Sequence, residues 1–275
     1  MDPGPTPAGG LRTGRRSGSL PDTGSVEVSL ERLLEHPFRR VIAYPHPTPE
    51  LVKERVEELS KLGVTALIPG GATQIDGVNV LGKGQVGVVT RCSWRGKPAA
   101  LKIRRTDADR ESLEDEAKVM TVANSKKVGP ILFAYSSNFI VMEEVRGKKL
   151  VDWLQECSSI PDLEFRRTLR SVCEQGRLLD EAGIDHRELS DPRRHVVLKE
   201  GSEACVLDFE TAGVTLRKRN VTRLVQYITM ARPFGRVVLS RLGADEFEVL
   251  RALRAYKEDP SKESFLALIE AMKLS

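Results

Sequence analysis

The sequence has few of the residues that stabilise small proteins through disulfides or metal sites, and few of the long apolar runs of membrane proteins. Its four cysteines are scattered, and none forms a C-x-x-C pair or lies near histidines at zinc-ligand spacing, which argues against a zinc site. No apolar run approaches the ~18 residues of a membrane span, and the N-terminus lacks the apolar segment of a signal peptide. We therefore expect a cytoplasmic protein that does not contact a membrane.

Aromatic residues make up only 5% of the chain, and the excess of positive charge is small, at +4. Such an excess is compatible with an acidic partner but does not identify one. Aromatic residues are not interleaved with basic ones near the N-terminus, as stacking on nucleic acid would require. Contact with nucleic acid or the ribosome therefore stays an alternative without a motif to support it.

The 275 residues are enough for one sizeable two-lobed domain, and their composition divides them into four segments. Residues 1–25 are rich in Pro, Gly and Ser, which predicts a disordered tail. Residues 26–75 are expected to form a helical extension, because apolar residues fall at helical spacing over 29–36 and 49–62. Residues 76–145 are expected to form a small lobe and residues 146–275 a large lobe.

The predicted fold is α+β, with a five-stranded antiparallel small lobe that carries one helix and a mainly helical large lobe. The expected small-lobe strands cover 78–81, 86–94, 98–103, 131–135 and 139–143, with the helix over 110–123. The expected large-lobe helices cover 150–155, 163–182, 220–231, 244–257 and 262–273, and two strand-like runs lie at 196–199 and 204–209.

A glycine-rich motif opens the small lobe. Residues 81–89, LGKGQVGVV, fit G-x-G-x-x-G-x-V, in which the glycines allow a tight turn between strands and a close approach of the backbone to phosphates. The same glycine spacing occurs in dinucleotide-binding folds, but there a helix follows the loop. Here a strand follows, then Arg95–Gly96–Lys97 and another strand. The motif therefore favours a phosphate-binding β-hairpin.

A lysine and a glutamate follow the glycine-rich motif at suggestive spacing. Ala99–Ala100–Leu101–Lys102 ends a strand fifteen residues after Gly87 and matches the V-A-I-K pattern, whose lysine contacts nucleotide phosphates. Glu116 follows fourteen residues later on the predicted helix, where an ion pair would orient Lys102. Alternatively, both are solvated surface residues. The order of the three elements favours the first interpretation.

The run 139–147, FIVMEEVRG, is expected to end the small lobe and lead into the connection between the lobes. The backbone of Glu143 and Val145 would then hydrogen-bond the edge of an adenine, with Met142 beside the pocket. A buried strand followed by a polar turn is an equally simple interpretation. The predicted nucleotide-binding residues are Gly82, Gly84, Gly87, Val89, Ala100, Lys102, Glu116, Glu143 and Val145.

Two motifs in the large lobe carry candidate catalytic groups. Residues 183–189, GIDHREL, follow a long predicted helix and precede a strand, as an H-R-D-L catalytic loop does. Asp208, in the run VLDFE of residues 206–210, stands in the place of the D-F-G aspartate, thirteen residues after His195. A carboxylate at this position suits the magnesium or manganese ion that bridges nucleotide phosphates.

In this order the motifs resemble those of the eukaryotic-like and RIO-type protein kinase superfamily over residues of about 76–235. The combination of G-I-D-H-x-E-L-S-x-P-x-x-H-V, D-F-E-T-A and R-N-V-T looks like a group of archaeal predicted serine/threonine protein kinases. The resemblance implies ATP, a divalent cation (Mg²⁺ or Mn²⁺) and transfer of the γ-phosphate to a serine or threonine hydroxyl of an unknown protein or of the kinase itself.

The sequence departs from the kinase pattern at three positions. Glu188 stands in the place of the catalytic aspartate, Arg193 in that of a metal-binding asparagine, and Glu210 in that of the D-F-G glycine. Glutamate and aspartate have similar intrinsic pKa values, so a glutamate at position 188 can still accept or orient a hydroxyl proton. His195 is the nearest substitute for the asparagine. The predicted catalytic residues are Glu188, Lys102 and Asp208, and the predicted metal ligands are Asp208 and His195.

The departures leave an alternative open. A nucleotide-binding pseudokinase that serves as a scaffold or switch would also tolerate them, and ATP binding without turnover would identify it. A small-molecule kinase is less consistent with the sequence, because such enzymes keep the aspartate and the asparagine. The basic residues that flank this region are suited to substrate phosphates or an acidic partner, or are simply solvated: Arg193, Arg194, Arg217, Lys218 and Arg219.

Overall fold

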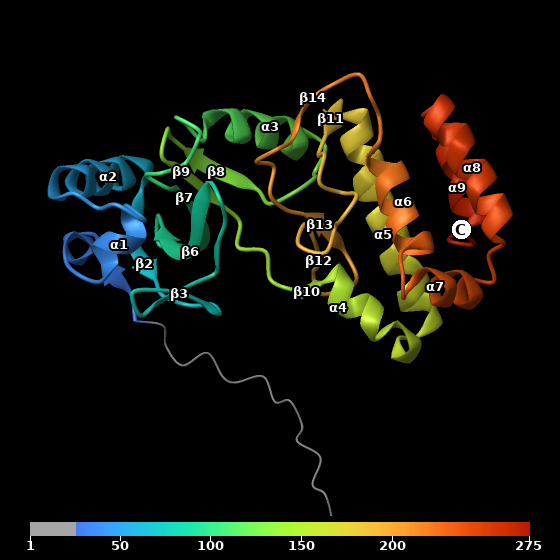
Figure 1. The fold of residues 1–275 in the computed structure, drawn as a ribbon, viewed down its shortest axis with the longest axis horizontal. Helices are drawn as coiled ribbons and strands as arrows, with labels where there is room; N and C mark the ends of the chain where they lie inside the picture. The colour runs from blue at the N-terminus through green and yellow to red at the C-terminus, as the bar shows by residue number, and fades with distance from the viewer. Residues whose placement is uncertain (1–25) are drawn as a thin grey trace, which may run out of the picture.

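The computed structural model describes residues 26–275, so the expected disordered tail, residues 1–25, lies outside the described residues. A twisted antiparallel sheet with the N-terminal segment forms one end of the molecule, and a group of helices forms the other (Figure 1). The short strands β12 and β13 lie between them (Figure 1). Among the helices of the described residues, none is long and apolar enough to cross a membrane.

The main sheet has seven strands in the order β1-β2-β6-β7-β9-β8, with β5 paired to β6. These strands are β1 (Val28–Ser29), β2 (Val64–Ile68), β5 (Gly82–Lys83), β6 (Gly87–Trp94), β7 (Lys97–Arg104), β8 (Leu132–Tyr135) and β9 (Phe139–Met142). The expected count of five is wrong, because two strands of the N-terminal segment add to the free edge of β6. The strand expected at 78–81 is β4 (Val78–Val80), which forms a separate hairpin with β3 (Thr73–Ile75).

The segment before the glycine-rich motif is only partly helical. A helix over 49–62 is present as α2 (Pro49–Leu62), where the Thr48 side chain accepts the first capping bond and Gly63 adopts a left-handed conformation after the last turn. The helix expected at 29–36 is instead a 3₁₀ turn, η1 (Glu31–Leu34), followed by α1 (Phe38–Ile42). Pro37 explains the break, since the residue before a proline disfavours the α conformation.

Buried contacts tie this extension to the sheet. Leu33 and Val41 belong to the same hydrophobic cluster as Val88 and Leu101 of the sheet. Arg55 of α2 is 1% exposed, and its guanidinium donates to Ile42 O at 2.6 Å and to Asn138 Oδ1 at 3.3 Å, at the turn between β8 and β9. The extension therefore shares one core with the sheet.

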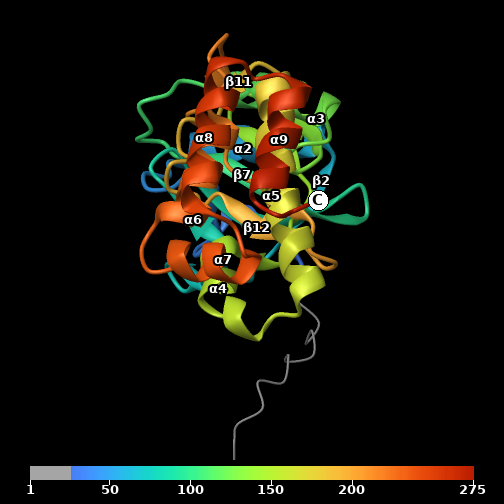
Figure 2. The same ribbon diagram turned by 90° about the vertical axis from the view of Figure 1, so that its right-hand side faces the viewer.

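The second hydrophobic cluster joins α3 (Glu114–Ser125) to the large lobe. The elements that follow the sheet are β10 (Lys148–Lys149), α4 (Leu150–Gln155), η2 (Cys157–Ser159), α5 (Asp162–Glu181), β11 (Ile184–Asp185), β12 (Val196–Leu198), β13 (Ala204–Val206), β14 (Gly213–Val214), α6 (Asn220–Met230), α7 (Gly235–Leu242), α8 (Glu246–Glu258) and α9 (Lys262–Ala271). Helices α8 and α9 lie side by side on the outside of α5 (Figure 2).

The expected hairpin is present, because β12 and β13 pair antiparallel. Helix α7 is missing from the sequence prediction, and α3 begins at Glu114, later than expected.

Candidate active site

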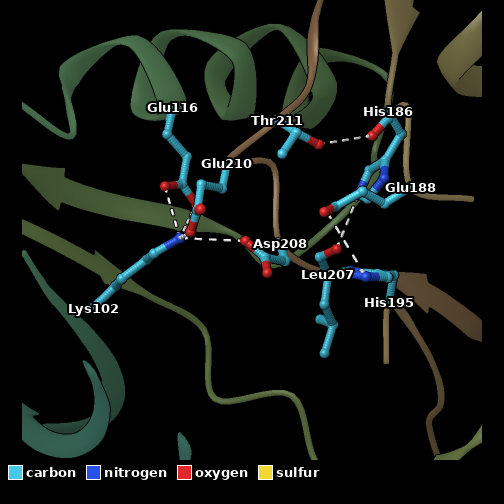
Figure 3. A network of polar contacts seen from close by, with 9 residues as sticks. All are labelled: Lys102, Glu116, His186, Glu188, His195, Leu207, Asp208, Glu210 and Thr211. Atoms are coloured by element: carbon cyan, nitrogen blue, oxygen red, sulfur yellow. Dashed lines mark hydrogen bonds and ion pairs between the residues drawn. The ribbon is translucent and has the colours of Figure 1, made fainter. Parts of the chain in front are cut away.

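Lys102, two residues before the end of β7, and Glu116 on α3 form a buried ion pair (Figure 3). The Lys102 Nζ lies 2.8 Å from both carboxylate oxygens of Glu116, and both residues are 5% exposed. A charged pair this deeply buried is costly unless its geometry is good, and two short hydrogen bonds satisfy that condition. The structure thus brings together the lysine and glutamate that the spacing paired, and neither is a solvated surface residue.

Two further carboxylates reach the same ammonium group. Asp208 Oδ1 lies 3.2 Å and Glu210 Oε2 3.3 Å from Lys102 Nζ. Burial alone lowers the pKa of Lys102, but the carboxylates, Glu116 foremost, raise this pKa above its usual value. Burial raises the pKa of Asp208, yet Lys102 outweighs it and holds this pKa below its usual value. Lys102 is therefore charged and Asp208 ionised at neutral pH.

A second cluster shares Asp208. One ligand atom each of Glu188, His195 and Asp208 lies within 4.8 Å of the others, and His195 Nε2 is 3.8 Å from Glu188 Oε2. The buried Nδ1 of His195 has no hydrogen-bond partner among the described residues. Two carboxylates and an imidazole are a plausible donor set for a divalent cation. The residues present thus fit a metal ion, and two of them are the predicted ligands Asp208 and His195.

The glycine-rich loop lies against Lys102. The Gly84 amide donates to Gly87 O at 2.8 Å, which closes the turn between β5 and β6. A Cβ on Gly87 would lie 3.1 Å from Lys102 Cε and 3.2 Å from Ile103 O, so a side chain there would press on the lysine. Gly82 pairs with Val89, and Val89 in turn pairs with Lys102. The predicted phosphate-binding residues are therefore neighbours in the sheet.

Comparisons with known proteins agree with this arrangement. The family model described as protein tyrosine and serine/threonine kinase matches residues 75–226, which is more than half of the chain. The chain belongs to this kinase family. It is 29% identical over 150 residues to the liver/testis isoform of the phosphorylase b kinase gamma catalytic chain of Rattus norvegicus, which covers 49% of this chain and 36% of that protein.

A second relative gives a similar result. The chain is 30% identical over 114 residues to the calcium/calmodulin-dependent protein kinase type IV of Mus musculus, which covers 40% of this chain and 24% of the relative. The chain thus matches well under half the length of the curated relatives. These matches support the broad kinase family, and the narrower resemblance to archaeal and RIO-type kinases stays a prediction.

The connection between the lobes of this kinase has fewer free backbone hydrogen-bonding groups for an adenine than expected. The Glu143 amide already donates to Ile131 O at 2.8 Å, and its carboxylate pairs with Lys199 at 2.8 Å. Only the Glu143 carbonyl is therefore suited to an adenine, whereas the described backbone hydrogen bonds leave the Val145 amide available. Ala100 is 4% exposed and pairs with Met142, the last residue of β9, so it lies next to the start of this connection.

A buried histidine, which the sequence analysis left without a role, holds the kinase loops together. His186 is fully buried, and its Nε2 donates to Leu207 O at 3.0 Å, one residue before Asp208 (Figure 3). Its ring also makes edge contacts with His195 and Phe209, at centroid distances of 5.6 and 5.4 Å. His186 therefore contacts both loop segments that contribute to the cluster of Glu188, His195 and Asp208.

A buried network around His186 anchors the loop that follows β11 to α5 and α6. Asn220 accepts from the His186 amide at 3.1 Å and donates to Asp180 Oδ1 at 2.8 Å and to Ile184 O at 2.6 Å. Asp180 also accepts from the Tyr256 hydroxyl at 2.9 Å. The sequence signal for this network was the R-N-V-T motif, to which no role was assigned.

Proposed function

We propose that this kinase binds ATP and transfers the γ-phosphate to a serine or threonine hydroxyl of a protein, its own chain included. The observation that carries the proposal is the position of Asp208, which contacts Lys102 on one side and belongs to the Glu188–His195 cluster on the other. A phosphate-binding lysine and a proton-accepting carboxylate are thereby joined through one metal-binding aspartate.

Positioning of the nucleotide is assigned to the small lobe. Lys102 would contact the α- and β-phosphates, and Glu116 holds its ammonium group in place. The backbone amides of residues 82–87 would surround the phosphates, since glycines leave the backbone exposed. The Glu143 carbonyl and the Val145 amide would bind the adenine edge.

Asp208 and His195 would hold the divalent cation, with Glu188 within reach of the same site. When bound, magnesium or manganese neutralises charge that develops on the transferred phosphoryl group. Imidazole nitrogen is a softer donor than the amide oxygen of asparagine, so His195 favours manganese relative to magnesium. The residues themselves supply the fixed geometry on which this site depends.

Glu188 is proposed to orient the acceptor hydroxyl or take its proton. Its side chain is 38% exposed, so an acceptor from solvent has access to it. A glutamate oxygen lies farther from the backbone than that of an aspartate, and an uncompensated displacement of about 1 Å costs ~100-fold in rate. His195 follows two residues after the position held by Arg193, and a loop lengthened by these two residues would provide a means of compensation.

Glu210 favours a second candidate function, a nucleotide-binding pseudokinase. Its carboxylate contacts Lys102, where a phosphate would bind in an active kinase. If the contact persists with nucleotide present, phosphates are poorly aligned and the protein acts as a scaffold or switch. Turnover therefore decides between the two functions.

The test is phosphate transfer from labelled ATP, to the protein itself and to a generic protein acceptor, with magnesium or with manganese. Glu188→Gln and Asp208→Ala are each expected to abolish transfer. Glu248→Gln, an exposed carboxylate on α8, is the matched control and is expected to leave transfer unchanged. Nucleotide binding without transfer under either metal would refute the active kinase and support the pseudokinase.

A further inference from the structure

Tyr44 of the N-terminal extension lies against the end of β7. Its carbonyl accepts from the Thr106 amide at 2.8 Å, and the His46 amide donates to Thr106 Oγ1 at 3.1 Å. These bonds fix the backbone on both sides of Pro45. The extension is thus attached to the segment that follows Lys102, independently of the contacts made by α2.

Two cationic side chains lie against the Tyr44 ring. One belongs to the glycine-rich loop and the other hydrogen-bonds it. Lys83 Nζ lies 5.2 Å from the ring centroid and 3.4 Å from the hydroxyl oxygen, and Arg105 Cζ lies 5.2 Å from the centroid. A cation within about 6 Å of an aromatic face is attracted by the ring quadrupole. Lys83 is itself the residue between Gly82 and Gly84.

Arg105 extends the contact to the loop backbone. Its Nη1 donates to Gly84 O at 2.8 Å, and its amide donates to Val86 O at 2.8 Å. Asp107 holds the guanidinium through two hydrogen bonds of 2.8 and 2.7 Å, so its direction is fixed. The loop is therefore held at Lys83, Gly84 and Val86 by groups that meet at one aromatic ring.

We infer that the extension is a positioning element of the kinase, and that Tyr44 holds the glycine-rich loop in the conformation that receives nucleotide phosphates. A loop ordered before binding does not lose that conformational freedom when the nucleotide binds, which increases affinity. The nucleotide part of this inference rests on the proposed function, whereas the order of the loop does not.

The experiment compares Tyr44→Leu, which removes the aromatic face, with Tyr44→Phe, which keeps it. Two cation–aromatic contacts at partly exposed positions correspond to about a tenfold change in a binding constant. Tyr44→Leu is therefore expected to weaken binding of a fluorescent ATP analogue about tenfold and to raise KM for ATP with little change in kcat. It should also speed hydrogen exchange at the Gly84 amide. Tyr44→Phe should retain most of the wild-type values.

A matched control lies in the same sheet. Arg95 covers the Trp94 ring at 4.9 Å, at the turn between β6 and β7 and away from the glycine-rich loop. Arg95→Asn removes that cation, tolerates the positive φ of this position, and is expected to leave nucleotide affinity unchanged.

Unchanged affinity and unchanged Gly84 exchange in Tyr44→Leu would overturn the inference. If the wild type binds no nucleotide, the proposed function fails, and the Gly84 exchange rate still decides whether Tyr44 orders the loop. If Tyr44→Leu does not fold, Arg105→Lys takes its place. This variant keeps the positive charge but loses the guanidinium that reaches both Asp107 and Gly84, and the same loss of affinity is expected.

Discussion

Glu210 determines how strongly Lys102 is engaged before a nucleotide arrives. Its Oε2 lies 3.3 Å from the Lys102 Nζ, and its side chain is 19% exposed. Two unit charges at this distance attract each other by about 5 kcal/mol at an effective dielectric constant of ~20. Lost hydration offsets most of this, and a hydrogen bond to a charged group has a net value of about 1.5 kcal/mol. Breaking the contact therefore costs about tenfold in a binding constant.

Glu210→Gln removes the charge and keeps the shape of the side chain. Phosphate oxygens compete with Glu210 for Lys102, so we expect the variant to bind ATP about tenfold more tightly than the wild type when no metal is present. Titration calorimetry with ATP in a metal chelator measures this difference directly. A metal-free comparison is needed because Asp208, two residues away, is a proposed metal ligand.

Glu174→Gln on α5 is the control, because Glu174 is an exposed carboxylate whose ion-pair partner among residues 26–275 is Arg170, four residues earlier. Its ATP affinity should equal that of the wild type. If Glu210→Gln binds ATP as tightly as the wild type, separating Glu210 from Lys102 has no free-energy cost. If it binds ATP more weakly, Glu210 assists binding. Either result refutes the competition between Glu210 and phosphate.

Three further predictions concern stability. A Cβ on Gly147 would lie 2.1 Å from Leu198 O, so Gly147→Ala should destabilise the protein by about 2 kcal/mol in denaturant unfolding. Asn220→Ala removes donors from Asp180 and from a buried carbonyl, and should cost about 3 kcal/mol, measured in the same way. Burial raises the pKa of Glu144, but its two arginine partners outweigh this and lower the pKa, so its stabilisation is present above pH 4–5 and is lost as pH falls. Glu144→Gln should accordingly destabilise the protein at pH 7, and the difference in stability from the wild type should shrink as the pH falls below 4–5.

The elements that the sequence predicted well are those with strong local signals. Helix α2 has a threonine cap, a proline in its first turn and a glycine after its last, and its predicted bounds match the structure. The pairing of Lys102 with Glu116 was predictable because a strand and the helix that follows it restrict where the thirteen intervening residues can lead. The order of the motifs indicated a protein kinase, and the family match over residues 75–226 confirms that part of the prediction.

The missing elements have weak local signals or depend on distant partners. Helix α7 begins with glycine and contains two adjacent valines, which have low helix propensity, so packing rather than sequence determines it. The strand β2 forms because β6 offers a free edge, which no local pattern reveals. The contacts of Tyr44 and Glu210 join residues that are far apart in the chain, and only the folded sheet brings them together.

The charge balance at Lys102 links the proposed activity to its alternative. One ammonium group faces the carboxylates of Glu116, Asp208 and Glu210, so the site without ligand carries an excess of negative charge. An ATP molecule adds phosphate charge to this excess, which disfavours its binding unless a cation accompanies it. Asp208 and His195 would hold a divalent cation whose charge would relieve the repulsion, and Lys102 would then be free to exchange Glu210 for a phosphate oxygen. Strong metal dependence of ATP binding is therefore expected of an active kinase, whereas metal-independent binding would favour the scaffold.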